Sequence, residues 1–279
     1  MKVAVIGAGT MGSGIAQTCA LAGHEVALLD TSHEALKRAE GAMSNSLARM
    51  AKKETISQEA AEEALKRVTI RHGISGLEGA GVVIEAVFES LEVKREVWSQ
   101  LAAVTSDGAL LASNTSSLSV TAIAEFSGRP ERFCGMHFFN PVPVMALVEV
   151  VRGLRSSEET VEQARAFAEG IGKTPIVCED KPGFIVNRLL VPYINDAVHA
   201  LSEGVANAED IDKAMKLGAN MPIGPLALAD LVGLDVCLAA AESLVAEFGD
   251  PKFRVAPLIR QLVRAGKLGR KTGEGFYSY

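Results

Sequence analysis

The chain has 279 residues, 48% of them hydrophobic and 22% charged, and this length suits one large core or two unequal domains, of which two are expected. No apolar run approaches the roughly 20 residues of a membrane span, so the composition excludes a membrane protein. The formal net charge of −6 lacks the basic balance that phosphate backbones require, which excludes nucleic acid as the default partner.

Short runs rich in Val, Ile and Leu alternate with helix-period stretches through the first two thirds of the chain. The runs predicted to be strands are Val3 to Ile6, Glu25 to Leu29, Arg67 to Arg71, Val82 to Ala86, Ala109 to Ala112, Phe133 to His137, Leu147 to Val151 and Pro175 to Cys178. This alternation is typical of βαβ units, and unbroken apolar strands suit a parallel sheet covered on both faces. Residues 1–181 are therefore expected to form a mostly parallel α/β domain.

The turn after the first predicted strand has the pattern of a dinucleotide-binding loop. Gly7-Ala8-Gly9-Thr10-Met11-Gly12 directly follows this strand and opens a predicted helix. Gly7 permits a tight turn, Gly9 lets the backbone approach a pyrophosphate, and Gly12 lets helix and strand pack closely. The helix N-terminus also offers N–H groups to the phosphates. The context predicts a Rossmann-like NAD-binding domain whose cofactor-binding residues include Gly7, Gly9, Thr10, Met11 and Gly12.

Asp30 ends the second predicted strand, where a carboxylate accepts hydrogen bonds from the adenosine ribose. It would repel a 2′-phosphate, and Thr31, Ser32 and His33 supply no arginine to reverse that preference. NAD is therefore favoured over NADP. The structural alternative is that Asp30 caps the helix that starts near Ser32.

The connection between Leu29 and Arg67 is too long for a simple crossover. It holds a predicted helix from Ser32 to Met50, a Lys52-Lys53-Glu54 corner, and a second helix that opens at Ser57. We expect a helical hairpin that stands off the sheet. Two interpretations stay open: a stabilising surface excursion, or a functional insertion.

After Lys181-Pro182-Gly183 the strand patterns disappear. Helical periodicity runs through Phe184 to Ser202, Ala208 to Lys216, Leu226 to Phe248 and Ala256 to Arg264. Residues 182–279 are therefore predicted to form a second, all-helical domain for substrate binding and dimerisation.

Four cysteines lie far apart in apolar contexts and form no CxxC pair. They are Cys19, Cys134, Cys178 and Cys237. Neither a zinc site nor a disulfide framework is predicted, and no metal site is expected. Because no export signal precedes the first strand, a cytoplasmic location is expected.

Three polar stretches occur where a purely structural role would favour apolar residues. They are Ser113 to Ser117, His137 to Pro141, and Asn187-Arg188. The first two begin where predicted strands end. Ligands of open α/β sheets bind at the carboxyl ends of the strands, so both stretches are expected to border one crevice. A hydroxyl, an imidazole and two amides would meet there.

At these motifs the sequence resembles the L-3-hydroxyacyl-CoA dehydrogenase family, especially its compact bacterial 3-hydroxybutyryl-CoA branch, over essentially the whole chain. The motifs that carry the resemblance are Val5 to Gly12, Glu85-Ala86-Val87-Phe88-Glu89, Ser113-Asn114-Thr115-Ser116-Ser117, His137-Phe138-Phe139-Asn140-Pro141, Lys181 to Arg188 and Gly269 to Tyr277. The resemblance implies NAD-dependent oxidation of a 3-hydroxyacyl-CoA to the 3-oxoacyl-CoA and the reverse reaction, with short acyl chains, as well as a homodimer formed through the helical domain.

The resemblance implies a catalytic pair of His137 and Glu149, with Ser116 and Asn187 holding the substrate. Alcohol oxidation needs a base that titrates near neutral pH, which imidazole provides. A carboxylate then orients the ring and stabilises the imidazolium. Glu149 is the one acid of a predicted strand beside His137, where an unpaired charge would be costly. Ser116 would donate to the substrate oxygen and Asn187 to the developing negative charge.

Each of these residues has a structural alternative. His137 could be a satisfied core histidine, Ser116 could cap a helix that begins near Leu118, and Asn187 could cap a helix or bridge the domains. Taken together, the four residues favour the catalytic interpretation.

The resemblance also implies further cofactor contacts. They are Glu89, Lys94, Asn114 and Asn140 around the nicotinamide half, and Lys271 near the adenine end. The alternative for Glu89 and Lys94 is an ordinary helix-start acid and a solvated lysine.

The phosphates of coenzyme A require local cations on an acidic protein. Lys52 and Lys53 lie at the expected tip of the hairpin, and the resemblance implies that Ser46 and Lys53 bind the pantetheine and phosphate region of the acyl-CoA substrate. Two solvated lysines at a helix end are the alternative.

Two other functions remain open on sequence alone. One is a Rossmann dehydrogenase of a free hydroxy acid or sugar acid, which shares the hydride chemistry and lacks coenzyme A. The other is a nucleotide-binding sensor or structural protein that kept the fold and lost the chemistry.

Overall fold

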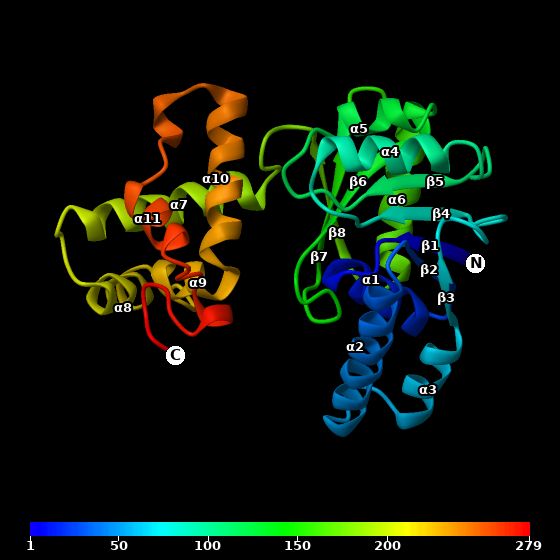
Figure 1. The fold of residues 1–279 in the computed structure, drawn as a ribbon, viewed down its shortest axis with the longest axis horizontal. Helices are drawn as coiled ribbons and strands as arrows, with labels where there is room; N and C mark the ends of the chain where they lie inside the picture. Colours follow the sequence, from blue (N-terminus) through cyan, green and yellow to red (C-terminus); the bar gives the residue numbers. More distant parts are fainter. The chain divides into compact units, whose positions relative to one another are not determined.

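Eight strands form one sheet in the first part of the computed structural model, which describes residues 1–279 (Figure 1). The strands are β1 (Lys2–Ile6), β2 (Glu25–Asp30), β3 (Val68–His72), β4 (Val82–Glu85), β5 (Leu110–Ser113), β6 (Phe133–Phe138), β7 (Leu147–Arg152) and β8 (Thr174–Glu179). Every neighbouring pair is parallel except β6 and β7, which run antiparallel. The predicted mostly parallel sheet is confirmed.

The strand order is β3-β2-β1-β4-β5-β6-β7-β8, and it reverses at β1. The chain first builds outward through β2 and β3, then returns to the other side of β1 with β4. This reversal is the switch point at which open α/β sheets bind ligands, outside the carboxyl ends of the strands. β4, β5 and β6 are buried at every position, as expected for strands covered on both faces.

Six helices accompany this sheet within the compact unit Met1–Lys181. They are α1 (Thr10–Leu21), α2 (His33–Lys52), α3 (Gln58–Lys66), α4 (Leu91–Leu101), α5 (Val120–Phe126) and α6 (Glu158–Gly170). The predicted hairpin is α2 and α3, whose N-caps are Ser32 and Ser57. Figure 1 shows both helices extending beyond the sheet.

The hairpin does not stand off the sheet along its whole length. Leu36, Ala39, Met43 and Leu47 recur at helical spacing along α2 and are all buried. They join the same apolar cluster as Val3 and other strand residues. The predicted hairpin is present, but this face of α2 packs into the core of the first unit instead of standing off the sheet, because an apolar stripe must be buried against a neighbour.

The second compact unit, Pro182–Tyr279, is helical, and the predicted all-helical domain is confirmed. Its helices are α7 (Val186–Ser202), α8 (Ala208–Gly218), α9 (Pro225–Val232), α10 (Leu234–Phe248) and α11 (Pro257–Arg264). The single helix predicted for Leu226 to Phe248 is wrong. Gly233 separates α9 from α10 with a φ of +104°, a conformation that favours glycine and ends the first helix. None of the helices in the chain is both long and apolar enough to cross a membrane.

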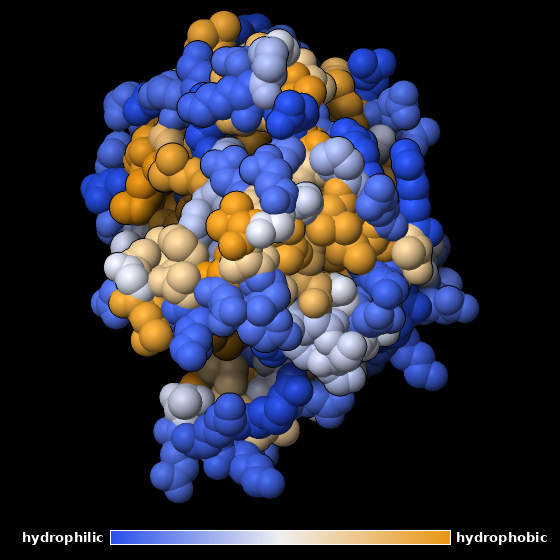
Figure 2. Space-filling view, turned by 90° about the vertical axis from the view of Figure 1, so that its left-hand side faces the viewer, coloured by the Kyte–Doolittle hydropathy of each residue, from blue (hydrophilic) through white to orange (hydrophobic).

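Several large apolar side chains of this helical unit remain exposed. Leu189, Leu231, Val232 and Val236 are between 41% and 68% accessible. Figure 2 shows apolar patches among hydrophilic side chains on the face that it presents. The apolar stretch around α9 thus divides into a buried set, such as Leu226 and Leu234, and an exposed set.

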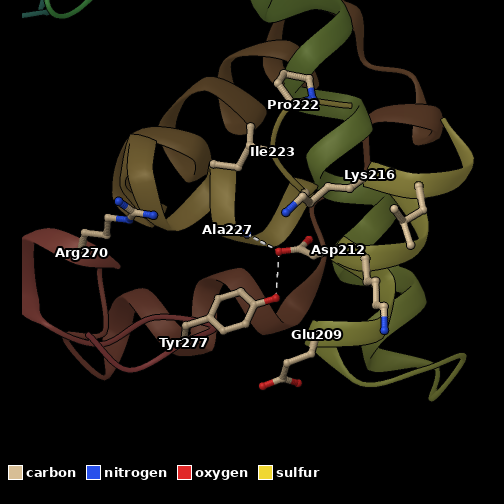
Figure 3. Close-up of a pocket in the computed structure, with 11 residues that line it drawn as sticks. Glu209, Asp212, Lys216, Pro222, Ile223, Ala227, Arg270 and Tyr277 are labelled. Carbon is tan, nitrogen blue, oxygen red and sulfur yellow. Dashed lines mark hydrogen bonds between the residues drawn. The ribbon is translucent and has the colours of Figure 1, made fainter. Parts of the chain in front are cut away.

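Two buried aspartates organise the helical unit. Asp212 of α8 accepts hydrogen bonds from the backbone N–H groups of Leu226 and Ala227, both at 2.8 Å, and from the Tyr277 hydroxyl (Figure 3). It thereby caps α9, which starts with a proline and has no capping side chain of its own. Asp230 of α9 accepts from the N–H groups of Phe276 and Tyr277, both at 2.9 Å. The two carboxylates fasten the C-terminal segment to the helices.

Candidate active site

In the glycine loop, which joins β1 to α1, neither Gly7 nor Gly12 has space for a side chain. A Cβ atom on Gly12 would lie 1.8 Å from the carbonyl oxygen of Gly7, and one on Gly7 would lie 2.6 Å from that of Ala86. Gly7 also has a φ of +103°. Around Gly9 no atom lies within 4 Å of an added Cβ, so this side of the loop is open. The arrangement fits a loop that lets a pyrophosphate approach the start of α1.

Asp30 holds this loop in place. Its Oδ2 accepts a hydrogen bond from the N–H of Ala8 at 2.7 Å, and its Oδ1 accepts from the N–H of Ser32 at 2.8 Å. The alternative that Asp30 caps α2 is wrong, because the cap is Ser32, whose hydroxyl accepts from Ala35. Sequence reasoning missed the contact between Asp30 and the loop backbone.

We expect Gly12→Ala to weaken NADH binding by roughly 100-fold or more, because the methyl group displaces the Gly7 carbonyl and with it the turn that is expected to hold the pyrophosphate. NADH fluorescence titration of the folded variant measures the loss. Gly41→Ala on α2 is the matched control, since nothing lies within 4 Å of its added Cβ. Wild-type affinity in Gly12→Ala would refute the placement of the dinucleotide on this turn.

His137 and Glu149 form a buried pair on neighbouring strands. They lie directly opposite each other in the antiparallel β6–β7 ladder. The His137 Nδ1 and the Glu149 Oε2 are 2.6 Å apart, with the residues 6% and 0% exposed. The ring of Phe139 lies 4.4 Å from the imidazole, centroid to centroid. A carboxylate so placed fixes the orientation of the ring and stabilises its protonated form.

Glu89 holds the loop that follows β5. Its Oε1 accepts hydrogen bonds from the Thr115 hydroxyl and the N–H of Ser116, both at 2.7 Å, and from the N–H of Ser117 at 3.1 Å. Burial alone would raise the pKa of Glu89, but the Lys94 ammonium and the hydrogen bonds from Thr115 and Ser116 outweigh it and hold that pKa below its usual value. Glu89 is therefore ionised at neutral pH.

The purely structural alternatives for Glu89, Lys94 and Ser116 are wrong. Glu89 precedes the α4 cap, Ser90, and its carboxylate binds the loop after β5 rather than the helix start. Lys94 is 1% exposed and is not solvated. Ser116 does not cap the next helix, because the cap of α5 is Ser119.

Four further predicted residues lie in the first unit. Asn114 follows β5, and its Oδ1 accepts from the N–H of Phe138 at 2.9 Å, next to His137 in the sequence. Asn140 is exposed just after β6. In the hairpin, Ser46 is half-buried on α2, and the exposed Lys53 is the C-cap of that helix.

Asn187 and Lys271 belong to the helical unit. Asn187 lies in the first turn of α7. Lys271 lies in a short 3-10 turn, Arg270–Thr272, and its Nζ is 2.5 Å from the Asp235 Oδ1 at the start of α10. Within its own unit, Lys271 therefore contacts a carboxylate.

One buried acid near the site was missed by sequence reasoning. Glu85 ends β4 and is 0% exposed, with its carboxylate bonded to Lys94 and Ser113. The signal was available in the sequence, because Glu85 is the single charge in the otherwise apolar run from Val82 to Ala86.

The switch-point glycine loop, its aspartate and the helical second unit together define a class: a protein with a Rossmann-type dinucleotide-binding domain followed by a helical domain. Residues 2–181 match the family model described as 3-hydroxyacyl-CoA dehydrogenase, NAD binding domain. Residues 183–279 match the corresponding C-terminal domain. The chain belongs to the 3-hydroxyacyl-CoA dehydrogenase family, and the resemblance seen in the sequence is confirmed.

Individual relatives cover the chain from end to end. A probable 3-hydroxybutyryl-CoA dehydrogenase of Deinococcus radiodurans is 47% identical over 279 residues, 100% of each chain. The mitochondrial hydroxyacyl-coenzyme A dehydrogenase of Mus musculus is 44% identical over 284 residues, covering 99% of this chain and 90% of the mouse protein. The crystal structure of (S)-3-hydroxybutyryl-CoA dehydrogenase from Ralstonia eutropha superposes with a TM-score of 0.96 at 47% identity, over 100% of this chain and 98% of that one.

Proposed function

We propose that this enzyme interconverts (S)-3-hydroxybutyryl-CoA and acetoacetyl-CoA, with His137 as the general base and acid. The observation that carries the proposal is the His137–Glu149 pair, 2.6 Å apart and buried on β6 and β7 of the sheet that carries the glycine loop. The names of the relatives from Deinococcus radiodurans and Ralstonia eutropha support the short acyl chain.

In the oxidative direction, the glycine loop from Gly7 to Gly12 would hold NAD, which would supply the hydride acceptor for C3 of the substrate. His137 takes the hydroxyl proton at Nε2, since Nδ1 faces Glu149. The Glu149 carboxylate stabilises the imidazolium that forms. In reduction the same imidazolium returns the proton to the 3-oxo group.

Ser116 and Asn187 are proposed to hold the substrate oxygen through their hydroxyl and amide groups. Glu89 accepts a hydrogen bond from the N–H of Ser116 at 2.7 Å and another from its hydroxyl at 3.2 Å, which supports a positioned role for Ser116. Asn114 and Asn140 are proposed to contact the nicotinamide half, as is Glu89. The Lys94 ammonium is buried between the carboxylates of Glu85, at 2.6 Å, and Glu89, at 3.3 Å. We therefore propose that Lys94 affects the cofactor site indirectly, by holding Glu89.

Two proposals concern the ends of the ligands. Asp30 is proposed to bind the adenosine ribose, in addition to holding the loop. Lys271 is proposed to lie near the adenine end, with Asp235 orienting its ammonium group.

The proposed function is tested by NADH oxidation followed at 340 nm with acetoacetyl-CoA and, in parallel, with free acetoacetate. Turnover of the thioester alone is expected. Turnover of acetoacetate at a similar kcat/KM would favour a free-acid dehydrogenase, and no turnover of either would favour a nucleotide-binding protein without this chemistry.

Lys53 provides a test of the coenzyme A site. We expect Lys53→Ala to raise KM for acetoacetyl-CoA by roughly 2- to 10-fold with little change in kcat, because an exposed ammonium contributes a screened attraction to a phosphate. Lys37→Ala, an exposed lysine on the same helix, is the control and should leave KM unchanged. An unaltered KM in Lys53→Ala would refute the role.

We also propose a homodimer formed through the helical unit. The exposed Leu231, Val232 and Val236 lie around the junction of α9 and α10, where a partner would remove them from water. Sedimentation equilibrium of the full chain should give twice the chain mass of 29.4 kDa. A mass of one chain at micromolar protein would contradict the dimer.

A further inference from the structure

Glu85 carries a charge at a position that normally holds an apolar side chain. It is the last residue of β4 and is fully buried. Its Oε1 accepts from the Lys94 ammonium at 2.6 Å and the N–H of Val87 at 2.9 Å, and its Oε2 accepts from the Ser113 hydroxyl at 2.7 Å and the Trp98 indole N–H at 3.4 Å. A buried carboxylate is tolerated only when it is bonded in this way.

The first branch from Glu85 runs through Ser113. The hydroxyl of Ser113 donates to Glu85 and accepts from the N–H of Thr115 at 3.2 Å. The backbone takes part as well, because the N–H of Asn114 donates to the carbonyl of Glu85 at 2.7 Å. The start of the loop after β5 is therefore tied to the end of β4.

The second branch runs through Lys94. The ammonium lies 3.3 Å from the Glu89 Oε2, while the Glu89 Oε1 accepts from the N–H groups of Ser116 and Ser117. Both branches thus end on residues 113–117, the last residue of β5 and the four residues after it, which we call the 113–117 loop. This loop contains Ser116, the residue proposed to hold the substrate.

The charges of this cluster do not balance one to one. Two carboxylates, Glu85 and Glu89, share the single Lys94 ammonium, which is 1% exposed and lies closer to Glu85. The Lys94 ammonium therefore lies between the two carboxylates, and its position depends on both of them. A buried ion pair often stabilises a fold no more than well-packed apolar side chains of similar volume do, so stability alone does not account for this arrangement.

We propose that Glu85 is a positioning residue of this enzyme, which fixes Lys94 and Ser113 and through them holds Glu89 and the 113–117 loop in the conformation that presents Ser116 to the substrate. The inference rests on the proposed role of Ser116. Glu85 itself contacts neither reactant. It acts by keeping the loop within the few tenths of an ångström that catalysis requires.

The test begins with Glu85→Gln, which keeps the shape and removes the charge. We expect kcat for acetoacetyl-CoA reduction to fall roughly 10- to 100-fold in a folded protein, with a smaller change in KM. Glu85→Asp, which keeps the charge on a shorter arm, should recover part of that loss. Leu101→Ala is the control. Leu101 is a buried residue of α4 whose side chain makes none of the hydrogen bonds around Glu85, so truncating it should lower Tm without lowering kcat.

A double-mutant cycle with Glu89→Gln gives the decisive comparison. If Glu85 acts through Glu89, the double variant should have nearly the same kcat as the worse single variant. Losses that multiply would overturn the relay, and so would an unchanged kcat in Glu85→Gln. If Glu85→Gln does not fold, Lys94→Gln, which removes the ammonium between the two carboxylates, takes its place in the same cycle with the same two outcomes. A wild-type enzyme that is inactive with acetoacetyl-CoA would refute the proposed function instead.

Discussion

Replacing His137 with glutamine is expected to lower kcat for acetoacetyl-CoA reduction by roughly 100- to 10,000-fold, the usual contribution of a general acid or base. Glutamine retains a polar side chain that can face Glu149 but cannot deliver a proton at neutral pH. NADH affinity should not change, because the proposed dinucleotide site, the glycine loop and Asp30, does not include His137. Steady-state rates and NADH fluorescence titration measure the two effects.

His72→Gln is the matched control for this prediction. His72 is an exposed histidine of β3, and its substitution should leave kcat at the wild-type value. A His137→Gln enzyme that retains wild-type kcat would remove the imidazole from the mechanism, whatever the change in its stability.

Glu149→Gln is expected to lower kcat by roughly 100- to 10,000-fold, as the loss of the orienting acid does in a hydrolase triad. The amide cannot stabilise an imidazolium, and its NH2 group can force the ring into the wrong tautomer. Because the two residues act as a unit, the double variant with His137→Gln should be no slower than the slower single variant.

Glu179→Gln on the neighbouring β8 provides the comparison for Glu149. Glu179 lies at the strand end beside Arg152 and should tolerate the change with wild-type kcat. If Glu149→Gln lowered Tm and left kcat intact, Glu149 would be a structural partner of His137 only.

The parts of the site that local patterns encode could be predicted. The glycine loop is one, because strand, turn and helix follow one another without a gap and the spacing of the glycines carries their function. The His137–Glu149 pair was also predicted, because the resemblance to the family implied it and Glu149 is the one acid of its predicted strand. Their distance and burial came only from the structure, because register depends on contacts between strands.

The features that sequence reasoning missed depend on tertiary contacts. Gly233 ends α9 although apolar residues continue beyond it, since α9 buries Leu226 and α10 buries Leu234. Asp30 bonds to the N–H of Ala8, which is 22 residues away in the sequence. Glu85 stood out as one charge in an apolar run, but its partners come from α4 and β5, and no local pattern links them.

The most direct test of the proposed reaction uses NADH deuterated at both C4 positions. In a single turnover of the full-length enzyme with acetoacetyl-CoA, the account predicts one NADH consumed per thioester and one deuterium found at C3 of the 3-hydroxybutyryl-CoA product by mass spectrometry. Recovery of acetoacetyl-CoA with no NADH consumed, or a reduced product without deuterium at C3, would contradict it.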